Sequence, residues 1–224
     1  MIVVAGPPGS GKSTAFPVSG FGVTFLNAYD RAAALNGGSY AGISRQIRQQ
    51  VNRDYEEFVI DHIKRRESFA IETTLRSKVT LEQARHGRSA GLRIEMRYLA
   101  LDGFSLHLER VKARADAGGH SASEATLRRI HSASLGNLPR AIEETDELWV
   151  YDNSKLGGPP RLVMEAKART IVFLEDPAPA WLAHAFGWGV SRQWFYPMNS
   201  ELVNAMLSNA DTAFTRMRTR PAKS

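Results

Sequence analysis

Residues 6 to 13 read Gly-Pro-Pro-Gly-Ser-Gly-Lys-Ser and directly follow the apolar run Ile2-Val3-Val4-Ala5. The pattern G-x-x-x-x-G-K-[ST] between a strand and a helix is typical of a phosphate-binding loop, whose glycines let successive N–H groups converge on an anion. In such a loop Lys12 holds phosphate oxygens and Ser13 offers its hydroxyl to Mg²⁺. We therefore predict a site for ATP or GTP. Its residues are Gly6, Pro7, Pro8, Gly9, Ser10, Gly11, Lys12, Ser13 and Thr14.

Strand-type apolar runs alternate with helical patterns along the chain, which predicts a mostly parallel sheet covered on both faces by helices. The expected fold class is α/β, in the three-layer α/β/α arrangement of P-loop NTPases. The predicted strands are 2–5, 23–27, 69–73, 93–101, 147–151 and 170–174, and the predicted helices are about 43–63, 77–89, 104–117 and from 122 onward. A Gly-Gly-Pro-Pro turn at 157–160 leads to a last strand region. Pro17 predicts a short or kinked first helix, because its ring clashes with the preceding turn.

The length of 224 residues predicts one elaborated domain, with residues 1–178 forming the phosphate-loop domain and 179–224 a helical extension packed on it. The net charge of +6 favours anionic partners. The absence of cysteine excludes a disulfide framework. A strand that begins at Ile2 leaves no charged leader, and no apolar run is long enough to span a bilayer. We therefore expect a soluble cytoplasmic protein with no membrane partner.

Four arginines flank a glycine turn at residues 118–119 and predict a lid over the phosphates, at about residues 110–130. The two pairs are Arg110 with Arg114 and Arg128 with Arg129. Phosphoryl transfer needs positive charge around the transferred group, so the phosphate loop favours a lid over the alternative of a solvated basic hairpin. His120, which follows the turn, either contacts phosphate or fixes the turn through a backbone hydrogen bond. The basic segment lacks interleaved aromatic residues, which argues against nucleic acid as the partner.

Polar residues follow two of the predicted strands at their carboxyl ends, where ligands bind in open α/β sheets. The first group is Glu72, Thr74 and Arg76, and the second is Asn27 and Asp30. We predict that both groups contact a polar substrate. Thr73, which lies between Glu72 and Thr74, fits an ordinary helix cap equally well. Asp30 is the candidate general base or magnesium carboxylate, and the alternative is an N-cap for the helix that follows.

Several of these segments, taken together and in their order along the chain, resemble the zeta toxin family of P-loop kinases over roughly residues 1 to 165. The segments that carry the resemblance are 6–14, 27–30, 71–74, Arg110-x-x-x-Arg114 with Gly118-Gly119-His120, Arg128-Arg129, Asn137-Leu138 and Tyr151-Asp152-Asn153-Ser154. The resemblance implies a kinase-like fold with a helical lid. It also implies an enzyme that uses ATP and Mg²⁺ to phosphorylate the amino-sugar hydroxyl of UDP-N-acetylglucosamine, and a separate antitoxin protein as its partner.

Carried over by position, the resemblance makes Lys12 and Ser13 the phosphate and magnesium residues and Arg110 the first lid arginine. Either Arg128 or Arg129 takes the second lid position. The sugar-nucleotide contacts it implies are Glu72, Thr74 and Arg76. One departure concerns the base, because Tyr29 stands where the family has its aspartate and Asp30 comes one residue later. Two alternatives stay open: a nucleic-acid-directed P-loop enzyme, and a non-catalytic ATP-binding interaction protein.

Overall fold

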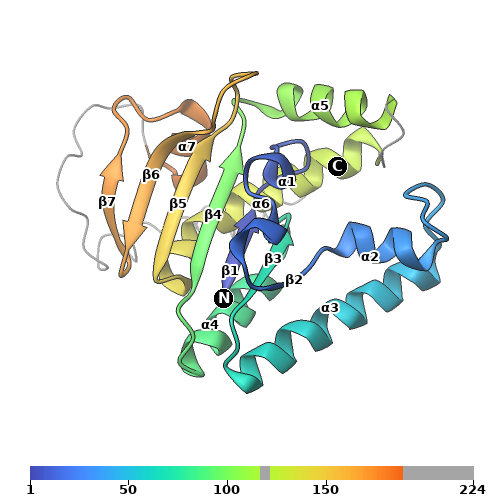
Figure 1. The fold of residues 1–224 in the computed structure, drawn as a ribbon. Helices are drawn as coiled ribbons and strands as arrows, with labels where there is room; N and C mark the ends of the chain where they lie inside the picture. Colours follow the sequence, from blue (N-terminus) through green and yellow to red (C-terminus); the bar gives the residue numbers. More distant parts are fainter. Residues whose placement is uncertain (117–121, 189–224) are drawn as a thin grey trace, which may run out of the picture.

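The computed structural model describes residues 1–116 and 122–188, which form an α/β fold around one seven-stranded sheet (Figure 1). The strand order is β2-β3-β1-β4-β5-β6-β7, and β2 to β5 run parallel. The last two strands add an antiparallel edge. The strands are β1 (Ile2–Ala5), β2 (Thr24–Leu26), β3 (Phe69–Thr73), β4 (Glu95–Ala100), β5 (Glu147–Asp152), β6 (Arg161–Lys167) and β7 (Thr170–Leu174). The predicted α/β class with a mostly parallel sheet is confirmed.

The helices match the predicted pattern in their order along the chain. They are α1 (Lys12–Ala15), the 3₁₀ turn η1 (Val18–Phe21), α2 (Ala28–Leu35), α3 (Arg45–Arg65), α4 (Val79–Ser89), α5 (Phe104–Asp116), α6 (Glu124–Glu144) and α7 (Ala180–Phe186). The first helix ends after four residues, as Pro17 predicts, and Pro17 then starts the 3₁₀ turn. The short helix α2 fell outside the predicted list, since its eight residues are too few to show a clear period.

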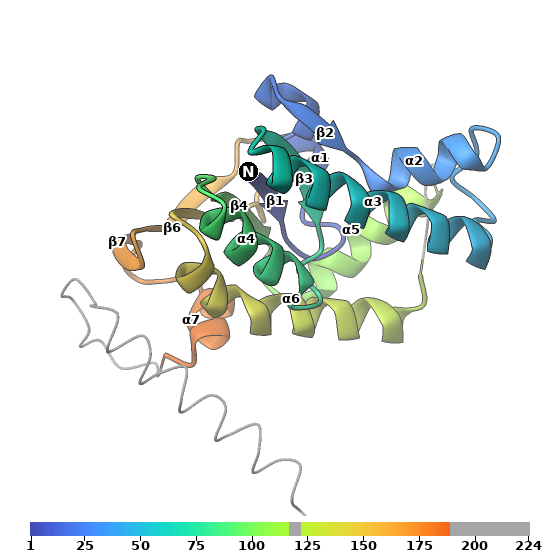
Figure 2. The same ribbon diagram turned by 90° about the horizontal axis from the view of Figure 1, so that it is seen from below.

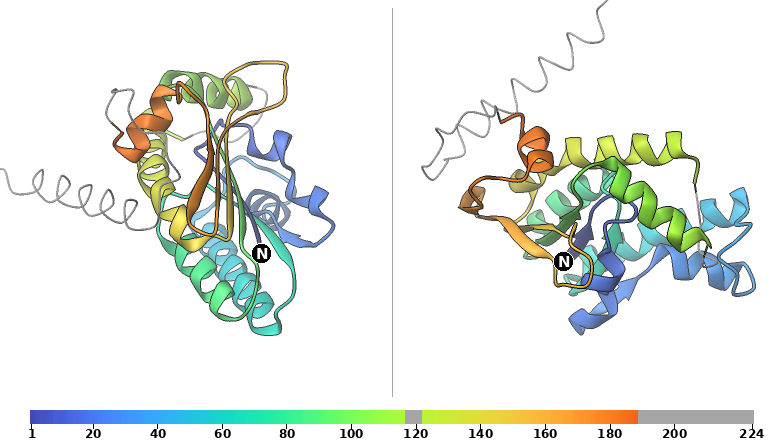
Figure 3. Two further views of the ribbon diagram at one scale, coloured as in Figure 1. Left: turned by 90° about the vertical axis from the view of Figure 1, so that its left-hand side faces the viewer. Right: turned by 90° about the horizontal axis from the view of Figure 1, so that it is seen from above.

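The two faces of the sheet are covered very unequally. One face packs against α3, α4, α6 and α7, which follow one another across it (Figure 2), and it carries the main core. The opposite face carries a small cluster of Val4, Val18, Ala70 and Leu99 with the residues around α1 and η1. Figure 3 shows α6 and α7 on one side of the sheet and the α1 region on the other. The site at the end of β1 therefore lies next to the thinner layer.

Parallel strands β1, β3, β4 and β5 place their carboxyl ends at one edge of the sheet, and α1 and α5 lie at this edge in Figure 1. The register aligns Val4 of β1 with Glu72 of β3, and Leu99 of β4 with Tyr151 of β5. This alignment brings the loop after β1 close to residues that are far apart in the sequence. Across the two described ranges, no helix combines the length and the apolar character that a bilayer span requires.

Candidate functional site

The phosphate loop between β1 and α1 runs so close to its neighbours that three of its positions, Gly6, Gly9 and Gly11, accept glycine alone. Gly9 has φ +80°, and a Cβ there would lie 2.6 Å from the carbonyl oxygen of His107. Gly11 has φ +89°, and a Cβ there would lie 2.4 Å from Nδ2 of Asn153. Side chains are strained at such positive φ values, so backbone conformation and neighbouring atoms both require glycine. The loop is thus pressed against α5 on one side and the end of β5 on the other.

Lys12 is buried at the base of this loop, with 7% of its side chain exposed. Its Nζ donates to the carbonyl oxygens of Gly6 (2.9 Å) and Pro7 (3.2 Å). Burial lowers the pKa of Lys12 to about 8; the negative charge of Glu72 opposes this shift and the positive charge of Arg114 adds to it. Arg114, a predicted lid residue, is therefore near enough to the loop for its charge to act on the ammonium group.

Glu72 contacts both residues that the loop motif assigns to phosphate and magnesium. The Ser13 hydroxyl donates to Oε2 of Glu72 at 2.8 Å, and Nζ of Lys12 lies 3.9 Å from Oε1. The Glu72 side chain is 10% exposed and sits on β3, directly beside β1. Sequence reasoning predicted Glu72 as a substrate contact. The structure instead brings this carboxylate to the expected magnesium hydroxyl, because sheet register fixes its position.

Helix α3 adds a tyrosine to the surroundings of Glu72. The Tyr55 hydroxyl is buried and has no hydrogen-bond partner within residues 1–116 and 122–188. Burial raises the pKa of Tyr55, and the negative charge of Glu72 raises it further. In the sequence, Tyr55 lies within the predicted helix 43–63 without any signal of its own. Nothing in a 3.6-residue period distinguishes a core tyrosine near a carboxylate from any other core tyrosine.

Asn27 and Asp30 belong to the start of α2. Asn27 is its N-cap, and its Oδ1 accepts from the N–H groups of Tyr29 (2.9 Å) and Asp30 (3.5 Å). Asp30 lies in the first turn, where its Oδ1 accepts from the Tyr40 hydroxyl at 2.9 Å. Within the described part of the chain, neither side chain hydrogen-bonds the phosphate loop. The capping role therefore falls to Asn27, and Glu72, not Asp30, lies beside Ser13.

The segment after β3 carries Thr74 and Arg76 on either side of the buried residue Leu75. Leu75 has φ +53°, and its carbonyl oxygen accepts from Nδ2 of Asn137 at 2.9 Å. Arg76 is exposed and Thr74 is half-buried. Thr73 has the structural role left open for it, since its Oγ1 accepts from the N–H of Leu75 and from the Thr80 hydroxyl.

The predicted lid arginines occupy helices α5 and α6. Nη2 of Arg110 donates to the carbonyl oxygen of Ser154 at 3.0 Å, and its buried Nε has no partner among the described residues. Arg128 pairs with Glu124 at 2.9 Å, and its guanidinium lies 4.2 Å from the ring centre of Phe104. Arg129 is exposed on α6. His120 and the glycine turn before it lie outside the described residues.

Two further side chains hold the loop, and sequence reasoning missed one of them completely. His107 on α5 contacts the carbonyl oxygen of Pro8, and Asn153 donates to that of Ser10 at 2.9 Å. Asn153 belongs to one of the segments that carry the family resemblance, Tyr151 to Ser154, whereas His107 is a histidine in an ordinary helical pattern, which carries no signal of such a contact. Asp152, which precedes Asn153, accepts from the indole N–H of Trp181 at 2.9 Å, and this bond fixes the end of β5.

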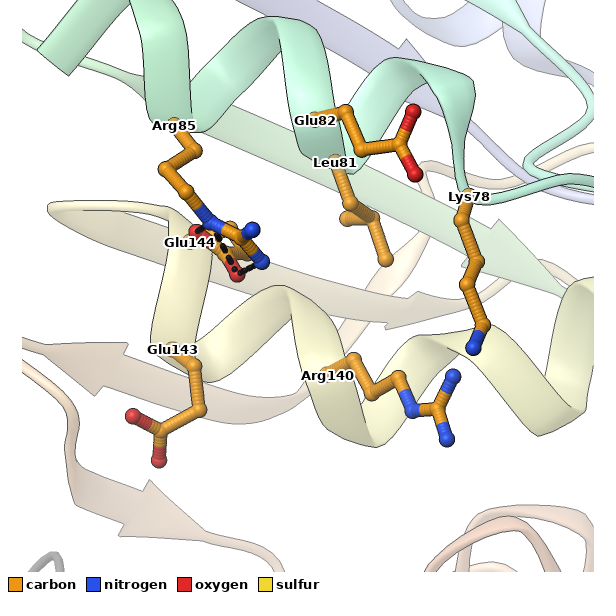
Figure 4. Close-up of a pocket in the computed structure, with 7 residues that line it drawn as sticks. All are labelled: Lys78, Leu81, Glu82, Arg85, Arg140, Glu143 and Glu144. Atoms are coloured by element: carbon orange, nitrogen blue, oxygen red, sulfur yellow. Dashed lines mark hydrogen bonds and ion pairs between the residues drawn. The ribbon is translucent and has the colours of Figure 1, made fainter.

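A groove of about 280 Å³ lies between α4 and α6, away from these residues (Figure 4). Its lining residues are Lys78, Leu81, Glu82, Arg85, Arg140, Glu143 and Glu144. An ion pair between Arg85 and Glu144 crosses it and joins the two helices, as Figure 4 shows. None of the predicted site residues lines this groove. The described residues contain no group of three or more His, Cys, Asp or Glu side chains able to hold a metal.

The fold is similar to those of several solved structures. The complex of AvrRxo1-ORF1 with AvrRxo1-ORF2 matches with a TM-score of 0.60 and 14% identity, over 96% of this chain and 73% of that chain. The same complex with ATP matches with a TM-score of 0.59 and 14% identity, over 93% and 70%. A chain of the PezAT chromosomal toxin-antitoxin system of Streptococcus pneumoniae matches with a TM-score of 0.52 and 12% identity, over 98% and 87%. At these identities the likeness shows a common fold. Neither the protein-family models nor the curated proteins gave a match.

Proposed function

We propose that this protein is an ATP-dependent kinase of the zeta toxin type, which transfers the γ-phosphoryl group to a hydroxyl of a sugar nucleotide such as UDP-N-acetylglucosamine. The observation that carries the proposal is the convergence of Lys12, Ser13 and Glu72 at the end of β1. A kinase site needs a cation for the phosphates and oxygen ligands for a metal, and this group supplies both. The fold similarity to a chain of the PezAT toxin-antitoxin system, and to the AvrRxo1-ORF1:ORF2 complex with ATP, supports the same conclusion.

The residues of the loop fit a triphosphate and Mg²⁺. The ammonium group of Lys12 bonds neutral carbonyls of its own loop, and phosphate oxygens, which carry negative charge, would replace them as its partners. The buried hydroxyl of Ser10 has no partner within the described ranges, so a ligand oxygen would complete its hydrogen bonding. Ser13 and Glu72 would hold Mg²⁺ with oxygen atoms, directly or through water. When bound, the metal neutralises charge on the phosphate oxygens and aligns them.

The remaining predicted residues are assigned to the acceptor and to charge neutralisation. Arg110, Arg114 and Arg128, on the two helices at the rim, would stabilise the negative charge that develops on the transferred group. Asp30 would accept the proton of the acceptor hydroxyl once that hydroxyl displaces Tyr40. Thr74 and Arg76, beside the strained Leu75, would contact the sugar nucleotide. We further propose a separate antitoxin partner, since the similar structures come from toxin-antitoxin and ORF1:ORF2 complexes.

The test is ATP consumption by the purified protein with and without UDP-N-acetylglucosamine, with ³¹P NMR to identify a phosphorylated sugar nucleotide. We expect turnover to rise when the sugar nucleotide is added, and the Lys12→Ala variant to abolish it. UDP-glucose, which lacks the acetamido group, serves as the control acceptor. Equal ATP turnover with and without any sugar nucleotide would refute the proposed acceptor class.

A second function, ATP binding without catalysis, is favoured by the residues around the proposed base. Tyr29 stands at the position where the resemblance calls for an aspartate, and it is 45% exposed. Asp30 is already hydrogen-bonded to Tyr40. Calorimetry that shows tight ATP binding, together with no phosphorylated product from a panel of nucleotide sugars, would select this second function.

A further inference from the structure

A phosphate loop binds anions through its N–H groups, so its carbonyl groups must point away from the ligand. In a planar trans peptide the C=O of one residue and the N–H of the next point in opposite directions. A side chain that holds a loop carbonyl from outside therefore also orients the following N–H toward the ligand. His107 stands in this relation to the peptide that joins Pro8 and Gly9, at 2.9 Å from the Pro8 oxygen.

The hydrogen bonds of His107 define its tautomer. The ring is buried, with 2% of the residue exposed. Its Nε2 lies 3.1 Å from the backbone N–H of Leu101, which can only donate, so Nε2 must be the unprotonated acceptor. Its Nδ1 faces the carbonyl oxygen of Pro8, which can only accept, so Nδ1 must carry the proton. Both ring nitrogens are satisfied, and the ring joins the end of β4 to the loop.

The surroundings keep this ring neutral and fixed. Burial lowers the pKa of His107 to about 3; the Pro8 carbonyl opposes this shift, and His131, Lys12 and Arg110 add to it. The ring of His131 on α6 packs edge-on against His107, with ring centres 4.8 Å apart. The backbone of α5 at His107 also lies against Gly9, where a Cβ would clash. The ring therefore cannot turn without moving the loop or α6.

Asn153 repeats this arrangement two residues further along the loop. Its Nδ2 donates to the carbonyl oxygen of Ser10 at 2.9 Å, which orients the following N–H, that of Gly11. The two side chains come from different elements, α5 and the end of β5, and hold alternate peptides. Independent elements that hold the same loop from outside make the inward direction of its N–H groups a property of the fold before any ligand binds.

We infer that His107 is a positioning residue of the nucleotide site, which as its Nδ1–H tautomer holds the Pro8 carbonyl outside the loop so that the Gly9 N–H faces bound phosphate. The inference rests on the proposed nucleotide binding. His107 would then raise the affinity for the ligand, an effect that packing in the core alone does not require. His107 takes no part in proton transfer.

The first test is the ¹⁵N NMR spectrum of the histidine rings between pH 5.5 and 8. We expect His107 to show a protonated Nδ1 and an unprotonated Nε2 throughout, with no titration in this range. A ring with the proton on Nε2, or one that titrates in this range, would overturn the inference whether or not nucleotide binds.

The second test compares three variants by calorimetry with ATP·Mg²⁺ and with inorganic tripolyphosphate. His107→Leu keeps the bulk and removes both hydrogen bonds, and we expect it to weaken binding of both ligands about tenfold, the value of one well-made hydrogen bond. His107→Gln supplies a donor and an acceptor side by side and should restore affinity to within about threefold. His62→Leu removes a histidine of α3 that bonds the Phe58 carbonyl, and serves as the matched control.

The outcomes separate the inference from the proposed function. Unchanged affinity of His107→Leu, or an equal loss in His62→Leu, would overturn the inference while ATP binding by the unaltered protein upholds the nucleotide site. Failure of the unaltered protein to bind either ligand would overturn the proposed function and the inference together.

Discussion

Replacing Lys12 by methionine should stabilise the nucleotide-free protein while it removes nucleotide binding. Lys12 is a buried ammonium group whose pKa falls to about 8 from its ordinary value of 10.5, chiefly because of burial. The folded state therefore disfavours the charged form, and the negative charge of the proposed phosphate ligand would offset this penalty. Methionine has a similar shape and no charge, so it removes the desolvation penalty at small steric expense.

The size of the effect follows from the pKa shift. Below about pH 8 the lysine is charged in both the folded and the unfolded chain, and a shift of this size corresponds to about 3 kcal/mol of lost stability. The variant also loses the hydrogen bonds from this charged donor to two loop carbonyls, worth at least about 1.5 kcal/mol, which leaves a net gain of at most about 2 kcal/mol. Between about pH 8 and 10.5 the unfolded chain binds more protons than the folded one, so the stability of the wild type rises with pH. The advantage of methionine should therefore fall to near zero by about pH 9.5.

Thermal unfolding without nucleotide, at pH 7 and at pH 9.5, measures both parts of this prediction. At pH 7 we expect the unfolding midpoint of Lys12→Met to rise by up to roughly 4 to 8 °C, the shift that about 2 kcal/mol produces in a domain of this size. Lys112→Met, at an exposed lysine of α5, is the matched control and should show no comparable change at either pH. A lower midpoint for Lys12→Met, or a gain that stays the same at both pH values, would show that Lys12 is not a strained buried cation.

Three further predictions concern the loop and the two carboxylates. Gly9→Ala should lower the free energy of unfolding by about 2 to 4 kcal/mol, since φ is +80° and the new Cβ meets the His107 carbonyl. Urea unfolding measures this free energy, and a loss below about 1 kcal/mol contradicts the prediction. Glu72→Gln keeps an acceptor for Ser13 but removes a charge, so the Mg²⁺ concentration needed for half-maximal turnover should rise at least tenfold, and an unchanged magnesium titration speaks against the assignment. Asp30→Asn should lower kcat by about 100-fold or more with little change in ATP affinity, and a wild-type kcat would remove Asp30 as the base.

Much of the fold was predictable because its signals are local. Three strands have the predicted bounds, since each is an apolar run closed by polar or turn residues. Pro17 ended α1 where its ring predicts. The antiparallel arrangement of β5, β6 and β7 was not predicted, because strand direction depends on pairing between distant segments and β6 was expected only as a strand region after the turn at 157–160. Alternation along one segment does not reveal the direction of its partner.

The candidate site also has residues with a local sequence signal and residues without one. The loop motif predicted Lys12 and Ser13 as site residues, because that motif consists of neighbours in the sequence. The contact of Ser13 with Glu72 and that of His107 with Pro8 join residues 59 and 99 positions apart, and only the sheet register and helix packing bring them together. A residue whose role depends on where an element packs carries no local signal, which is why His107 looked like any other helical residue.

The two carboxylates of the site differ in how the fold holds them, and this difference argues for different roles. Glu72 sits on β3 in register with β1, and its carboxylate accepts from the Ser13 hydroxyl, so its position is set before any ligand arrives. A metal site gains from such preorganisation, because each ligand must stand at a fixed distance. Asp30 lies on the short helix α2 and is hydrogen-bonded to the exposed Tyr40, a partner that an acceptor hydroxyl can replace atom for atom. A base that must exchange one hydroxyl for another in each cycle suits this position, so the fixed carboxylate lies where we propose the metal and the exchangeable one where we propose that the proton is accepted.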